Sequence, residues 1–236
     1  MYKLMIYNPL KCYLDSFNLL NKCNPFLAVA LADDMFPTTL LKMIGGLEQK
    51  LKEIAWQVAT DDLEFRRDLL YNTGGIHTFK YKDSFNYKDI KSLYDYINLK
   101  TDKNSRATDN INNQIEFYEE AYKILSSQFG QLNFIHTAFI SHWELFESNE
   151  LIKSIKNNNK KNILKAANKF NLKELLNSAI DSRHKFAHNT YSFQARFSSL
   201  SRVGSSSHPE NYFMYFFILI YIDHCFMDII KNLRNL

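Results

Sequence analysis

The chain has 236 residues, of which 46% are hydrophobic and 15% aromatic, so it can bury a sizeable core and is not globally disordered. Its three cysteines are odd in number and lack zinc-ligand spacing, which argues against a disulfide framework and fits a reducing cytoplasm. Residues 1–150 hold 16 basic and 20 acidic residues, a net of −4, whereas residues 151–236 hold 13 and 5, a net of +8. The basic C-terminal part fits a polyanionic partner such as nucleic acid, but charge alone favours a solvated lysine-rich face.

Two helices are predicted in the first half of the chain. In the first, apolar residues recur at helical spacing, although Gly45 and Gly46 could break it. Residues 62–72 are predicted to form the second, which ends before a glycine pair at 74–75, and the alternating segment 76–82 could be a short strand. The apolar positions of the first helix are Leu41, Ile44, Leu47, Leu51, Ile54 and Val58.

The polar stretch KTDKNSRATDN, residues 100–110, interrupts this periodicity. We therefore expect a boundary there, between a mostly helical N-terminal region of unknown role, residues 1–109, and a second domain, residues 110–236. The second domain is predicted to be a bundle of four or five helices, which makes the protein all-α. Its expected helices span residues 111–128, 131–153, 162–169, 171–188 and about 210–234, with a Lys/Asn-rich hinge at 156–162.

The most apolar segment is YFMYFFILIYI, an uninterrupted run of 11 residues from Tyr212 to Ile222. Polar residues follow it at once, and a membrane-spanning helix needs about 20 apolar residues. We therefore expect a buried core helix here rather than a membrane span. The N-terminus also lacks the basic and apolar regions of a secretory signal, so we expect a cytoplasmic protein with no membrane partner.

The segment DSRHKFAHNT, residues 181–190, gathers several hydrogen-bond donors in an otherwise apolar chain. At 100° per residue, Arg183 shares one helical face with Leu176, Ile180 and Ala187. A charge on an apolar face needs a partner, because burying it alone is costly. That partner could be a phosphate or, in the alternative interpretation, a carboxylate across the bundle.

Spacing alone does not identify a site here. Arg202 and His208 repeat a similar arginine–histidine spacing in a Ser/Gly-rich loop. A metal site is a further alternative, because His184 and His188 stand at the i and i+4 positions that a helix uses to hold zinc. However, HKFAH lacks the glutamate of a metalloprotease helix, and Arg183 and Lys185 would place two cations beside the metal ion. We therefore expect no metal or other cofactor.

The segment RHKFAHN resembles the signature of the HEPN superfamily, in which an arginine and a polar residue precede a histidine by four to six residues, commonly in an Ala-His context. Upstream, FISHWELFES, residues 139–148, resembles the Trp-Glu helix of several HEPN families of bacterial defence and toxin systems. The resemblance covers about residues 110–236 and implies a HEPN-like helical bundle. It also implies a metal-independent endoribonuclease that works as a homodimer, with the motif helices of two protomers lining one cleft.

The resemblance also implies roles for individual residues. His188 would act as general acid or base on the RNA, and Arg183 would stabilise the phosphorane, where negative charge develops. His184 would bind the phosphate or orient its neighbours, and Glu144 would anchor the arginine or the histidine. Asn189 would support the site, and the RNA backbone would be contacted by Lys185, Arg196 and Arg202.

The resemblance also implies a partner besides RNA, either an antitoxin or a defence-system protein, because some HEPN toxins are paired with a nucleotidyltransferase antitoxin. In some of these toxins a tyrosine lies two residues after the histidine and is modified by the antitoxin, whereas this chain has Thr190 there and Tyr191 one position later. Some HEPN domains are not nucleases. The alternative hypothesis is therefore a non-catalytic helical dimer that binds nucleic acid or a partner protein.

Overall fold

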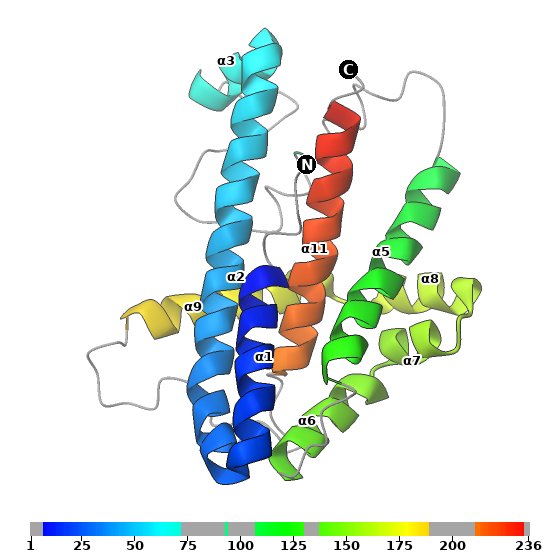
Figure 1. The fold of residues 1–236 in the computed structure, drawn as a ribbon. Helices are drawn as coiled ribbons and strands as arrows, with labels where there is room; N and C mark the ends of the chain where they lie inside the picture. The colour runs from blue at the N-terminus through cyan, green and yellow to red at the C-terminus, as the bar shows by residue number, and fades with distance from the viewer. Residues whose placement is uncertain (1–6, 72–92, 94–106, 130–136, 189–210, 234–236) are drawn as a thin grey trace.

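The computed structural model describes residues 7–71, 93, 107–129, 137–188 and 211–233, and every regular element in these ranges is an α-helix (Figure 1). The prediction of an all-α protein is therefore confirmed. The segment 76–82, for which a strand was one possibility, lies outside the described residues.

Helices α1, Tyr7–Cys23, and α2, Pro25–Asp61, form an antiparallel hairpin (Figure 1). Asn24 separates them, because its extended backbone ends α1 and its side-chain oxygen accepts a hydrogen bond from the Leu27 amide at 3.2 Å. This is the usual role of an asparagine at a helix N-terminus, and Pro25 follows at the first position, where its missing N–H costs nothing.

Helix α2 continues through the glycine pair that could have broken it. Two glycines inside a helix cost about 1 kcal/mol each relative to alanine. Their neighbours Met43, Ile44 and Leu47 are completely buried, and this tertiary packing outweighs the low helix propensity. Asp62 then ends α2 and caps α3, Leu63–Tyr71, so the helix expected over residues 62–72 is present.

Helix α11, Tyr212–Leu233, forms the centre of the molecule and packs against α2, α5, α6 and α9 (Figure 1). Helix α5, Ala107–Phe129, includes the predicted helix 111–128. Every residue from Tyr212 to Asp223 is buried. By length and composition α11 could cross a membrane, but 83% of its apolar window is buried in the bundle, as expected for a core helix.

The single helix expected over residues 131–153 is wrong, because two helices occupy the described part of this range. They are α6, Thr137–Ser148, and α7, Glu150–Lys156. Asn149 causes the break, since its backbone is extended and its side chain accepts a hydrogen bond from the Leu151 amide at 2.9 Å.

Helix α8, Lys160–Lys169, begins inside the hinge expected over 156–162, so only residues 157–159 separate it from α7, and α9, Leu172–His188, follows. Within that hinge Asn158 has a φ of 50°, a left-handed conformation that asparagine tolerates better than most residues. The described part of the second domain therefore contains six helices, α5 to α9 and α11, rather than four or five.

One hydrophobic core includes helices from both sides of the boundary expected near residue 110. Helix α2 packs against both α9 and α11, and the buried ion pair between Lys50 and Asp223 crosses the same contact. In the part of the chain that the structure describes, the two predicted regions are therefore joined by packing rather than by a linker alone.

Candidate functional site

Helix α9 carries the arginine–histidine motif and crosses α2 and α11 (Figure 1). Its N-terminal turns hold it in the core, where Leu176, Ala179 and Ile180 are buried. Ser178 is hydrogen-bonded to the Tyr215 hydroxyl of α11 at 2.9 Å. These contacts fix the axis of the helix that presents the motif.

The last turns of α9 contain Arg183, His184, Lys185 and His188 in helical backbone, as the sequence predicts. The described side chains of this helix end at Asp181, so no contact of these four residues is described. Position 183 follows Ile180 by three residues and therefore continues the register of the buried face. In Figure 1 this end of α9 extends past α2, away from the centre of the bundle.

Positions 183 and 188 lie about 140° apart around the helix axis and about 7.5 Å apart along it, from the standard geometry of an α-helix. The two positions therefore belong to different faces of the helix. A phosphate contacted by both groups needs either a bent arginine side chain or a second copy of the helix.

Of the other predicted site residues, only Glu144 has a described side chain. Glu144 lies exposed on α6. Asn189, Arg196 and Arg202 lie outside the described residues, as does His208 of the second arginine–histidine pair. The roles predicted for Asn189, Arg196 and Arg202, and the anchoring role predicted for Glu144, therefore stay predictions.

The tryptophan of the Trp-Glu helix has a structural role. Trp143 packs edge-on against Phe213 with ring centroids 5.1 Å apart, and Phe146 lies beside it at 5.1 Å. Asn211 connects this helix to α11 by donating from its side-chain amide to the carbonyl oxygen of His142 at 2.9 Å. The helix α6 is therefore held firmly against the start of α11.

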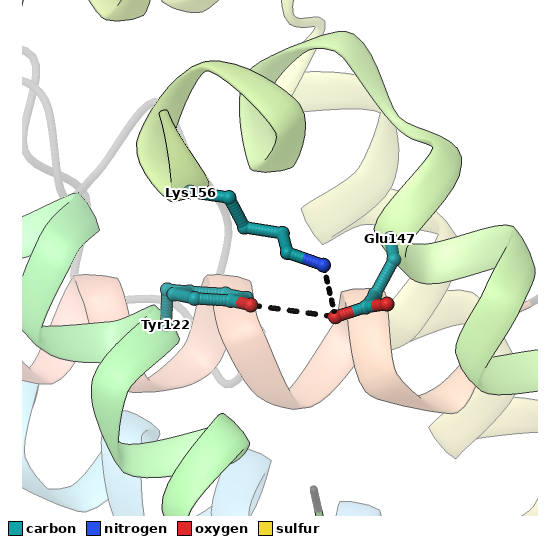
Figure 2. A network of polar contacts seen from close by, with 3 residues as sticks. All are labelled: Tyr122, Glu147 and Lys156. Atoms are coloured by element: carbon teal, nitrogen blue, oxygen red, sulfur yellow. Dashed lines mark hydrogen bonds and ion pairs between the residues drawn. The ribbon is translucent and has the colours of Figure 1, made fainter. Parts of the chain in front are cut away.

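Glu147, a second glutamate of α6 that was not among the predicted site residues, contacts Lys156 and Tyr122 (Figure 2). Its Oε1 accepts from the Lys156 ammonium at 2.8 Å and lies 3.4 Å from the Tyr122 hydroxyl. Burial, together with the nearby Glu147 carboxylate, raises the pKa of Tyr122 to about 12. These contacts of Glu147 join α5, α6 and α7. The sequence signal for Glu147 was its position three residues after Glu144, on the same helix.

A second missed group of charges lies between α2, α5 and α11. Lys50 and Asp223 form an ion pair with only 6% and 1% of their side chains exposed. Next to it, His224 Nδ1 lies 3.1 Å from Glu120 Oε2, and its ring stacks on Phe117. Burial lowers the pKa of His224, and the Glu120 carboxylate opposes this shift. Lys50 and Asp223 are buried in the contact between α2 and α11, whereas about half of the Glu120 side chain is exposed.

Within the described ranges no three His, Cys, Asp or Glu side chains are grouped as a metal site requires. His184 and His188 are not covered by this finding, so the metal alternative at the motif is not decided.

Comparisons with protein-family models, with curated proteins and with solved structures gave no match.

Proposed function

We propose that the protein is a metal-independent endoribonuclease of the HEPN type, and that Arg183 and His188 of α9 form its catalytic pair. The observation that supports this proposal most is the placement of the motif on one continuous helix whose first half is fixed in the core. A rigid scaffold for reacting groups is what catalytic positioning requires. The basic C-terminal part of the chain supports a polyanionic substrate.

In this mechanism the 2′-hydroxyl of RNA attacks the adjacent phosphorus, and the 5′-oxygen of the next nucleotide leaves. His188 removes the hydroxyl proton or protonates the leaving oxygen, because an imidazole can both accept and donate a proton near neutral pH. Arg183 neutralises the charge that develops on the phosphorane. The products are a 2′,3′-cyclic phosphate and a 5′-hydroxyl, and no metal takes part.

The separation of the two positions around the helix supports a homodimeric site. Since positions 183 and 188 of one helix are about 140° apart, two antiparallel copies of α9 can place the arginine of one protomer near the histidine of its partner. A cross-link between cysteines introduced at Ala187 of both protomers tests this arrangement. A monomer at micromolar concentration would contradict it.

The direct test of the function uses purified protein, RNA and two variants. Arg183→Ala and His188→Ala should each lower the cleavage rate by about 10²–10⁴-fold, which is the usual cost of losing an acid–base group. His208→Ala removes the histidine of the second pair and is the matched control, for which we expect no loss in the rate of cleavage. Equal activity of all variants would exclude the proposed pair.

The cellular role that we propose is that of a toxin or an antiphage effector. Expression of the wild type should then stop growth, while His188→Ala should not. If the protein binds RNA and arrests growth without cleaving RNA, the alternative of a non-catalytic helical dimer is the better interpretation.

A further inference from the structure

A shallow pocket of about 360 Å³ lies between α7 and α8, on the part of the bundle opposite the end of α9 that carries the motif (Figure 1). Lys153 of α7 and Lys165 and Lys169 of α8 line it, together with the buried Ala166. Ser154 and Asn162 add two polar side chains. The pocket is therefore small, open and rich in hydrogen-bond donors.

The charges of α8 are arranged unfavourably for an isolated helix. Lys161, Lys165 and Lys169 follow each other at i, i+4 and i+8, so they form one row of like charges. Lys160 and Lys161 also lie in the first turn, where the helix dipole favours acidic residues, and α8 contains none. Residues 150–169 together hold six lysines and one acidic residue, Glu150. A bound anion would relieve this repulsion.

The protein itself does not neutralise the pocket. On α7, Lys156 is engaged by Glu147 at 2.8 Å, outside the pocket. Among the described residues, no carboxylate forms an ion pair with Lys153, Lys165 or Lys169. Glu150 lies in the same pocket and offsets one of the three charges, so the pocket keeps a net charge of about +2.

We propose that this pocket binds consecutive phosphates of a single RNA strand, and the choice of RNA rests on the function proposed above. Lysine ammonium groups bind phosphates as point charges without regard to sequence. A membrane surface fits less well, because neither α7 nor α8 exposes a large apolar side chain. Helix α9 alone is about 25 Å long, so a strand bound here would be held well away from the cleavage motif. The pocket is thus a remote substrate-binding site.

Fluorescence anisotropy of a labelled single-stranded RNA of mixed sequence tests the proposal, in full-length protein that carries His188→Ala and cannot cleave the probe. The added triple variant Lys153→Gln, Lys165→Gln, Lys169→Gln should bind about 50-fold more weakly at 0.15 M salt, and the slope of log K against log salt should become shallower by about 2. The matched control replaces three exposed lysines of α1 and α5 and keeps the same net charge. It carries Lys11→Gln, Lys22→Gln and Lys123→Gln, and should bind nearly as the parent does.

The proposal is overturned if the triple variant binds like the control, or if the parent protein binds no RNA. A melting curve checks that the triple variant is folded, and relief of the lysine repulsion should leave its Tm unchanged or raise it. In protein with His188 intact, the triple variant should raise KM and preserve kcat. If the triple variant cleaves RNA with an unchanged KM, the proposed nuclease function is retained and the RNA-binding role of the pocket is excluded. If neither the wild type nor any variant cleaves RNA, but the triple variant alone loses RNA binding, the RNA-binding role of the pocket is retained and the nuclease function is excluded.

Discussion

Lys50 and Asp223 form a buried ion pair that joins α2 to α11, although 173 positions separate them in the sequence. Both side chains are almost fully removed from solvent. Desolvating each charge is costly, so each of the two buried side chains depends on its partner. The pair is therefore a specific connection between the N-terminal helices and the central helix.

Replacing only one partner of this pair should be strongly destabilising. Asp223→Leu leaves the Lys50 ammonium buried without its carboxylate, and we expect the free energy of unfolding to fall by about 3–5 kcal/mol. Lys50→Met combined with Asp223→Leu should recover most of this loss, because two apolar side chains pack where two charges were. Urea denaturation followed by circular dichroism measures both variants.

The control for this experiment is Lys156 of α7, which pairs with Glu147 at 2.8 Å and keeps 43% of its side chain exposed. Lys156→Ala should change stability by less than about 1 kcal/mol. A similar small effect for Asp223→Leu would show that the pair does not hold α2 against α11.

The titration of His224 should make the protein less stable in mild acid. Burial lowers the pKa of this imidazole below its ordinary 6.5, so the unfolded chain takes up the proton first. The contribution of neutral His224 to the free energy of unfolding is fully present above about pH 6.5. It is lost as the pH falls through the lowered pKa of the folded state. His224→Gln should flatten the pH dependence of stability in this window. An NMR titration of His224 with a midpoint above 6.5 would contradict the expected shift.

Gly45 is a site where stability should increase on substitution. It lies inside α2, and a methyl group built on its Cα meets no atom within 4 Å. Gly45→Ala should therefore raise the free energy of unfolding by about 0.5–1 kcal/mol through helix propensity and reduced freedom of the unfolded chain. A loss of stability in thermal or urea denaturation would mean that α2 needs a glycine at this position.

The two glutamates of α6 should separate structure from activity. Glu147→Gln weakens the contacts with Lys156 and Tyr122, and it should lower stability by about 1 kcal/mol. Glu144 is exposed, so Glu144→Gln should change the free energy of unfolding by less than about 0.5 kcal/mol. If Glu144 anchors the motif as proposed, its variant should instead reduce RNA cleavage. Unfolding and cleavage assays on both variants distinguish the roles, and an active Glu144→Gln would rule out the anchor.

The sequence predicts the helices of the second domain well where apolar periodicity is strong. The expected helix 171–188 differs from α9 by one residue, and α11 lies within the expected range of about 210–234. In contrast, the prediction of a single helix over 131–153 did not take account of Asn149, whose capping side chain divides α6 from α7. A capping residue between two apolar runs was a readable signal.

Contacts between distant segments could not be predicted in the same way. Leu10, Leu14 and Phe17 have helical spacing in α1, yet their partner α2 is known only from the structure. Lys50 lies among the buried positions of α2, but its pairing with Asp223 depends on the meeting of two helices. For the motif, the sequence predicts the helical backbone of α9, which the structure confirms, and the groups that contact Arg183 belong to the homodimer that we propose.

Product-end analysis of RNA cleaved in excess EDTA tests the central claim most directly. Purified wild-type protein should leave 2′,3′-cyclic phosphate or 3′-phosphate ends and 5′-hydroxyl ends, and His188→Ala should leave the RNA intact. A deoxyribose at the cleavage position should block the reaction, because the attacking 2′-hydroxyl is missing. Cleavage that returns only with Mg²⁺, or that produces 5′-phosphate ends, would contradict the proposed mechanism and favour a metal site at His184 and His188.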